Sequence, residues 1–143
     1  MIITICSSLY FVKEIGEVAE KLRELGHEVF VPSTAEQVLS GKMDVSDIEK
    51  EKEAGLASDR TIKNNAIIRH YKKIEKSEAI LVLNYEKKGI KNYIGGNVFL
   101  EIGFAFILNK KIFLLNPIPE VNYSDEIIAM QPIILNGDLG NIK

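Results

Sequence analysis

The sequence is poor in the residues on which several classes of protein depend. Its 143 residues include one cysteine, two histidines and no tryptophan. A single cysteine cannot form an internal disulfide or a Cys-rich zinc site, and it fits a reducing cytoplasm. With only His27 and His70 available, a His-based metal site is not expected. We predict structural roles for both histidines and no cofactor.

A surplus of one charge and long apolar runs are also missing. The formal net charge is −2, so the chain has no basic surplus with which to displace counterions from a nucleic-acid polymer or to hold an anionic membrane. No stretch approaches the roughly 18 apolar residues of a membrane span. The opening MIITICSSLYFVKE has neither a basic leader nor a small-residue cleavage site and predicts a first strand. We expect a cytoplasmic protein without nucleic-acid polymer or membrane partners.

Common nucleotide-binding and hydrolase motifs are absent as well. No G-x-G-x-x-G follows the first apolar run, and no G-x-x-x-x-G-K-[ST] occurs anywhere, which argues against dinucleotide and P-loop triphosphate binding. The sequence shows no recognisable Ser/His/Asp catalytic triad. Any nucleotide-related role therefore needs a different kind of site.

Five short apolar runs alternate with helical patterns along the chain. The runs cover residues 2–6, 29–31, 79–83, 112–115 and 133–135, and the helical patterns include residues 9–25, 59–76 and 124–130. Residues 41–58 are charged with a thin apolar stripe, which predicts a mobile or lid-like, partly helical excursion. The alternation predicts one α/β domain, flavodoxin-like or Rossmann-like, with a five-stranded parallel sheet and helices on both faces.

The expected strand order is 2-1-3-4-5, which places a ligand crevice beyond the carboxyl ends of the strands where the order reverses. The loops after the first and third strands should line this crevice. Those loops contain Ser7, Ser8, Tyr10, Asn84, Gly95, Gly96 and Asn97.

A helix that begins near Gly96 or Asn97 carries one carboxylate, Glu101, in an otherwise apolar stretch, NVFLEIGFAF. A carboxylate in such surroundings needs a partner or a function. Glu101 lies about one turn into the helix, where its side chain can point back toward the crevice. A capping or helix-dipole role is the alternative that the residues leave open.

Other residues of the crevice also allow two interpretations. Tyr10 can hydrogen-bond a carboxylate or a sugar, or it can pack on the core. Asn84 can contact a ligand or satisfy loop backbone groups. Gly95 and Gly96 can present free N–H groups to an anion or a ribose, or they can form a plain turn.

Together these features resemble the nucleoside 2-deoxyribosyltransferase superfamily, which includes the transferases and the deoxynucleoside 5′-monophosphate N-glycosidases. The resemblance is carried by Tyr10 after the first strand, by the AILVLN strand, and by a glycine-containing loop followed by E-I-G-F-A with Glu101 and Gly103. It extends over nearly the whole chain in order and spacing.

The resemblance implies a retaining displacement at the anomeric carbon of a deoxyribose. Glu101 would attack C1′, expel the base and hold the sugar as an ester until water or a second base takes it, and Tyr10 would orient the carboxylate. The family's aspartate at the end of the third strand is Asn84 here, which can bind a base but cannot supply a proton. Asp59 either helps with that proton or caps its own helix.

The resemblance leaves the 5′ end of the substrate open. Ser7 and Ser8 could accept a phosphate at a helix start. Ser124 resembles the family region that reaches the active site of a neighbouring subunit, which implies a homodimer or higher homo-oligomer, although the adjacent Asp125 and Glu126 would repel a dianion. The expected substrate-binding residues are Ser7, Ser8, Asp59, Gly95, Gly96, Asn97, Ser124 and Met130.

The leading expectation is therefore cleavage or transfer of the N-glycosidic bond of a 2′-deoxynucleoside or its 5′-monophosphate. The lack of an acid at Asn84 favours a rival, a non-catalytic nucleotide-binding or sensing module on the same fold. A flavin-binding domain is a weaker third possibility because the loop CSSLYF lacks the Ser/Thr/Gly-rich phosphate cradle of flavodoxins.

Overall fold

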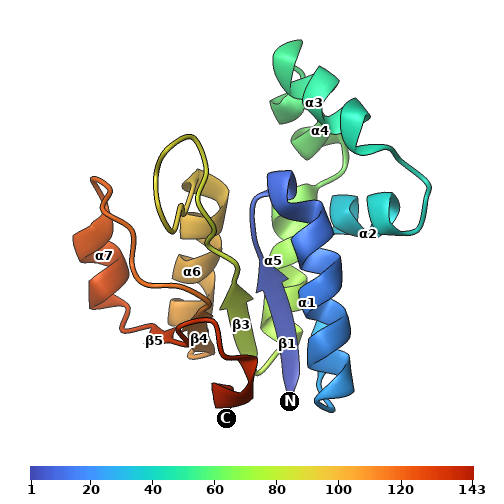
Figure 1. The fold of residues 1–143 in the computed structure, drawn as a ribbon. Helices are drawn as coiled ribbons and strands as arrows, with labels where there is room; N and C mark the ends of the chain where they lie inside the picture. Colours follow the sequence, from blue (N-terminus) through green and yellow to red (C-terminus); the bar gives the residue numbers. More distant parts are fainter.

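A five-stranded parallel sheet organises the computed structural model, which describes residues 1–143 (Figure 1). All neighbouring strands pair in parallel, and the strand order is β2-β1-β3-β4-β5. The predicted fold class and strand order are thereby confirmed. The strands are β1 (Ile2–Cys6), β2 (Glu28–Phe30), β3 (Ala79–Val82), β4 (Lys111–Leu114) and β5 (Ile133–Ile134).

Helices cover both faces of the sheet, as predicted. One buried cluster joins the sheet to α1, and a second joins the opposite face to α5, α6 and α7. None of the helices combines the length and the apolar character needed to cross a membrane. The helices are η1 (Leu9–Phe11), α1 (Val12–Glu24), α2 (Ser33–Leu39), α3 (Val45–Glu53), α4 (Ala57–Lys63), α5 (Ala66–Lys76), α6 (Gly96–Ile107), α7 (Ser124–Ala129) and η2 (Leu139–Asn141).

The side chains of β1 alternate between these two layers, as the pleat of a strand requires. Ile3 and Ile5 belong to the cluster with α1, whereas Cys6 belongs to the cluster with α5 and α6. Thr4, also fully buried, hydrogen-bonds Ser77 just after α5 (Oγ1 to Oγ, 2.6 Å). Cys6 therefore ends β1 with its thiol directed into the layer that holds α5 and α6.

Residues 41–58, expected to form a lid-like and partly helical excursion, are mostly helical. Asp44 caps α3 and exchanges capping-box hydrogen bonds with Asp47, which explains why so polar a segment starts a helix. In Figure 1, α3 and α4 stand beyond the carboxyl end of β1. Residues 41–58 therefore lie at the end of the sheet where the ligand crevice was predicted.

The single helix expected over residues 59–76 is instead two helices, α4 and α5. Asn65, between them, has a left-handed backbone with φ +49°. Asparagine is among the few non-glycine residues that adopt this conformation readily. The break lets α5 pack beside β1 and α6 while α4 leans away with α3.

Candidate active site

A cavity of about 380 Å³ opens at the carboxyl ends of β1 and β3, where the strand order reverses. Its walls come from the loop after β1, the start of α2, helices α3 to α5, the loop before α6 and α6 itself. The volume lies in the range of pockets that enclose nucleotide-sized molecules. The crevice predicted from the strand order is therefore present.

Seven of the eleven predicted site residues line this cavity. They come from the loop after β1 and from the first two turns of α6. They are Ser7, Ser8, Tyr10, Gly95, Gly96, Asn97 and Glu101.

Asn84 does not line the cavity, and its side chain takes the second of the two roles that the sequence left open, the one that satisfies loop backbone groups. The residue is fully buried. Its Nδ2 donates to the carbonyl oxygens of Asn116 (2.9 Å) and Pro117 (3.0 Å), and its Oδ1 accepts from the Asn116 backbone N–H (2.9 Å). Both N–H donors and the oxygen of the Asn84 amide are therefore engaged in joining the ends of β3 and β4.

The remaining three predicted residues also lie outside the cavity. Asp59 is exposed in the first turn of α4, and Arg60 lines the cavity in its place. Ser124, at the start of α7, binds the Pro119 carbonyl through its hydroxyl (2.6 Å). Met130, after α7, borders a separate hollow near the start of β4. Within a single chain, none of these side chains reaches the candidate site.

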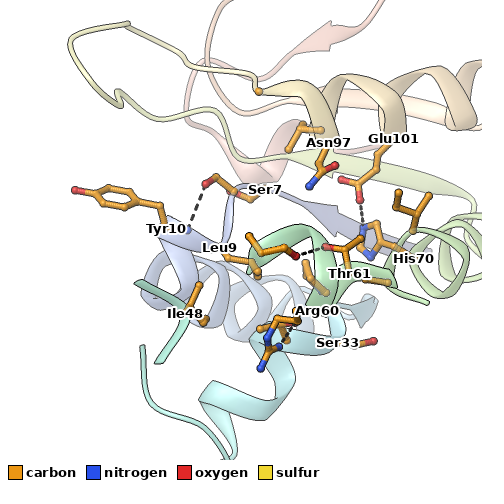
Figure 2. Close-up of a pocket in the computed structure, with 18 of the residues that line it drawn as sticks. Ser7, Leu9, Tyr10, Ser33, Ile48, Arg60, Thr61, His70, Asn97 and Glu101 are labelled. Atoms are coloured by element: carbon orange, nitrogen blue, oxygen red, sulfur yellow. Dashed lines mark hydrogen bonds and ion pairs between the residues drawn. The ribbon is translucent and has the colours of Figure 1, made fainter. Parts of the chain in front are cut away.

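Glu101 lies next to two side chains whose proximity could not be predicted from the sequence, His70 and Cys6. Figure 2 shows the contact of Glu101 with His70. His70 Nε2, on α5, is 3.3 Å from Glu101 Oε2 and 3.5 Å from Cys6 Sγ at the end of β1. The donor atoms of the three residues lie within 4.8 Å of one another, a set that could also hold a metal ion. Glu101 is 17% exposed, whereas His70 and Cys6 are buried.

Burial disfavours charge on each member of this Cys6–His70–Glu101 cluster. Burial raises the pKa of Glu101 to about 8, although a hydrogen bond from the Cys6 thiol partly opposes the increase. Burial, with a smaller effect of Lys73, lowers the pKa of His70 to about 4, while the Ile5 backbone acts in the opposite direction. Burial also raises the pKa of Cys6 well above its ordinary value. Near neutral pH the cluster therefore holds protons on Cys6 and Glu101 and a neutral imidazole.

Tyr10 does not orient Glu101 in this structure. Its side chain is 65% exposed and points away from Glu101 in Figure 2. The ring packs edge-on against Phe11 and lies under the ammonium of Lys87, 5.3 Å from the ring centre. The contacts of Glu101 come from His70 and Cys6 instead.

A cationic corner forms where the loop before α6 meets the loop after β1. Lys87 Nζ donates to Ser8 Oγ (3.0 Å) and lies 5.5 Å from the centre of the Tyr93 ring. Partial burial lowers the pKa of Lys87, and the nearby ammonium of Lys52 on α3 adds to that decrease. Lys87 and Lys52 both line the cavity, as do the carboxylates Glu49 and Glu51 on α3. An anionic group bound near Ser8 would lie within reach of the Lys87 ammonium.

The start of α6 adds a second feature that suits a polar or anionic group. Gly95 precedes the helix and has no side chain with which to cap it. The first backbone N–H groups of α6, at Gly96 and Asn97, are therefore uncapped at the cavity wall. A Cβ on Gly95 would meet the Tyr93 ring at 3.0–3.3 Å, so this close approach favours glycine.

Arg60 ties the excursion to the body of the domain. It pairs with Glu51 on α3, donates to Thr34 Oγ1 on α2 (3.3 Å) and contacts the Met43 sulfur. This network joins the wall made by α3 and α4 to α2. Arg60 could not be identified from the sequence because its partners are 9 to 26 positions away, beyond the spacing of a helical pattern.

No protein-family model matches the chain, and neither does any curated protein sequence.

Proposed function

We propose that the protein cleaves or transfers the N-glycosidic bond of a 2′-deoxynucleoside or its 5′-monophosphate, with Glu101 as the nucleophile. The observation that carries this proposal is the location of Glu101. It is the most buried of the carboxylates that line the cavity, and His70 Nε2 lies 3.3 Å from it. The resemblance of the sequence to the deoxyribosyltransferase superfamily supplies the reaction class.

In the proposed reaction, the carboxylate of Glu101 attacks C1′ while the bond from C1′ to the base breaks. The transition state has oxocarbenium character, and a poorly solvated anion next to C1′ stabilises it. Water then attacks C1′ of the glutamyl ester in a hydrolase, or a second base attacks C1′ in a transferase. Either step regenerates Glu101 and retains the configuration at C1′.

Glu101 must lose its proton before it can attack. The proton passes to solvent as the pH approaches the raised pKa of Glu101, about 8, because His70, with a pKa lowered to about 4, is too weak a base to take it. His70 Nε2, 3.3 Å from the carboxylate, can donate a hydrogen bond to it in the tautomer that carries the proton on Nε2. The Cys6 thiol supplies a further hydrogen bond to the carboxylate. The base leaves on the opposite face of the sugar, where solvent rather than Asn84 or Asp59 provides its proton.

The cationic corner favours the 5′-monophosphate over the free nucleoside. A phosphate near Ser8 would meet the Lys87 ammonium, and Lys52 can approach it from α3. A charge-assisted hydrogen bond of this kind is roughly twice as strong as a neutral one. The uncapped start of α6 offers further donors to the sugar or the phosphate.

We also propose that the chain works as a homo-oligomer. Helix α6 exposes Leu100 (43%), Phe106 (45%) and Ile107 (78%), and Ile128 on α7 is 54% exposed. Exposed apolar side chains on α6 and α7 suit contact with a second copy, although Leu100 also lines the cavity. Light scattering on the purified protein tests this part: a mass of one chain at micromolar concentration would contradict it.

The test of the activity is a chromatographic assay of deoxynucleosides and deoxynucleoside 5′-monophosphates, with and without a second free base. We expect released or exchanged base with at least one substrate. Glu101→Gln, which keeps the size of the side chain but not its nucleophile, should lower turnover on the order of 10³-fold or more. Glu20→Gln, on the exposed face of α1, is the matched control. Binding without turnover in the folded wild type would favour the sensing module.

A further inference from the structure

We propose that Cys6, His70 and Glu101 form a binding site for one divalent transition-metal ion, for which Zn²⁺ is the best match. The three residues come from β1, α5 and α6, and each offers one donor atom: a thiol sulfur, an imidazole nitrogen and a carboxylate oxygen. Sulfur and nitrogen donors together favour zinc and similar ions over magnesium or calcium.

The distances between the donor atoms fit a tetrahedral ion. An ion at about 2.3 Å from sulfur and about 2.0–2.2 Å from nitrogen and oxygen holds neighbouring ligand atoms roughly 3.3–3.6 Å apart. The distance from Cys6 Sγ to His70 Nε2 is 3.5 Å, and that from His70 Nε2 to Glu101 Oε2 is 3.3 Å. All three atoms lie within 4.8 Å of one another, and rotation about the side-chain bonds of Glu101 can bring its carboxylate oxygen closer to Cys6 Sγ.

The charge balance also favours a divalent ion. Binding replaces the protons of the Cys6 thiol and the Glu101 carboxyl group: one M²⁺ enters and two H⁺ leave, with no change in oxidation state. A thiolate and a carboxylate together neutralise M²⁺, so the site has no net charge before or after binding. The burial that disfavours a lone charge on either residue does not oppose the neutral complex.

The position of the cluster allows an ion to enter and a fourth ligand to bind. His70 and Glu101 line the cavity, and Cys6 lies behind them as the innermost donor. Water or a donor atom from a cavity ligand can occupy the fourth position. Three protein ligands and one open position is the arrangement of zinc sites that exchange their fourth ligand.

The nearest cation does not prevent binding. Lys73, whose charge contributes to the low pKa of His70, is engaged elsewhere. Its ammonium donates to the Val31 carbonyl (2.7 Å) and to Ser33 Oγ (3.1 Å), and it pairs with Glu36 at 3.3 Å. Its charge is therefore balanced at the edge of the sheet.

Metal binding should oppose nucleophilic attack because a bound ion takes up the negative charge of the Glu101 carboxylate, which the attack on C1′ needs. Micromolar Zn²⁺ should inhibit turnover, and a chelator should restore it. This consequence rests on the proposed function, whereas the metal site itself does not.

The test is titration of the folded wild-type protein with Co²⁺, a spectroscopic substitute for Zn²⁺. We expect a thiolate-to-cobalt charge-transfer band that saturates at one ion per chain and disappears when Zn²⁺ is added. Because Cys6 is the only cysteine in the chain, such a band can come from no other residue. A folded wild-type protein that gives no thiolate band overturns the proposal without any variant.

Variants separate this site from adventitious binding at the amino terminus, where His27 Nδ1 is 3.0 Å from the Met1 nitrogen. Cys6→Ser should lose the band, His70→Gln should weaken Co²⁺ binding at least about tenfold, and His27→Gln should change neither. Binding abolished by His27→Gln and kept by His70→Gln would overturn the proposal. Turnover without a cobalt band would contradict the metal site alone, and a cobalt band without turnover would contradict the proposed activity alone.

Discussion

His70 Nε2 lies 3.3 Å from Glu101 Oε2, in surroundings where neither group is favoured to carry a charge. The pKa of Glu101 is raised to about 8 and that of His70 is lowered to about 4, in both cases mainly by burial. At neutral pH the carboxyl group of Glu101 is therefore mostly protonated, and the imidazole of His70 is neutral. Both stability and activity should depend on whether Glu101 carries its proton.

Stability should fall as the pH rises from 6.5 to 8. Between its unfolded pKa of 4.5 and its folded pKa of about 8, Glu101 binds a proton in the folded state only, so stability decreases with pH. His70, at about 4 folded and 6.5 unfolded, has the opposite effect, but only below pH 6.5. Above pH 6.5 the Glu101 effect remains, with a slope of at most about 1.4 kcal/mol per pH unit. Urea unfolding at a series of pH values measures it.

Glu101→Gln should remove this slope, because the amide does not titrate, and the variant should exceed the wild type in stability at pH 8. Glu20→Gln, which replaces an exposed carboxylate, should keep the wild-type slope. A wild-type protein whose stability rises from pH 6.5 to 8 would mean that Glu101 is already ionised when folded.

Activity should rise with pH toward a plateau above about pH 8, since the nucleophile is the ionised form of Glu101. The profile of kcat/KM is best measured with a deoxynucleoside, because a 5′-phosphate itself ionises near pH 6. Below the plateau we expect about a tenfold decrease per pH unit. Activity that decreases from pH 6 to 8 would instead indicate that the protonated carboxyl group acts as an acid.

Asn84→Asp should destabilise the fold without a direct effect on the chemistry. A carboxylate would face the carbonyl oxygens of Asn116 and Pro117, which now accept hydrogen bonds from Asn84. The loss should be about 2–4 kcal/mol at neutral pH and smaller at low pH, where the new carboxyl group is protonated. Thermal unfolding measures this loss.

Asn122→Asp, at an exposed position, is the control and should change stability little. For Asn84→Asp, kcat per folded molecule should stay within about threefold of the wild type, because the residue does not line the cavity. A variant of normal stability with a large loss of kcat would instead indicate that Asn84 takes part in catalysis.

Lys87→Gln should raise KM for a deoxynucleoside 5′-monophosphate on the order of tenfold and leave KM for the free nucleoside unchanged. The reason is that its ammonium, bonded to Ser8, is the cation assigned to the phosphate. Lys88→Gln is a matched control, since Lys88 is exposed and does not line the cavity. Equal effects on both substrates would show that Lys87 does not bind the phosphate.

The sheet could be predicted from the sequence because its signals are local. Each strand is a short apolar run, and each crossover contains a helical period, so the right-handed winding rule leaves few topologies. The break at Asn65 escaped prediction because asparagine also occurs inside helices and neither glycine nor proline marks the position.

The candidate site could be predicted only in part. The location of Glu101 follows from one helix start, but its partners Cys6 and His70 are 95 and 31 positions earlier in the chain, and only the packed sheet brings them together. The signal that could have identified His70 is its place on the buried face of α5, four residues before Ile74. Which of its two roles Asn84 has could not be predicted, because a polar residue at a strand end faces either the crevice or the neighbouring loop and the sequence does not determine which.

The central claim is that Glu101 attacks C1′ of a deoxyribose. The most direct measurement is the intact mass of the protein after incubation with a 2′-fluoro-substituted deoxynucleoside or its 5′-monophosphate, which slows breakdown of a glycosyl ester by destabilising the oxocarbenium transition state. The account predicts an increase equal to one sugar or sugar phosphate, mapped by proteolysis to Glu101 and absent from Glu101→Gln. Turnover of the natural substrate together with an adduct on another residue, or with undiminished activity in Glu101→Gln, would contradict it.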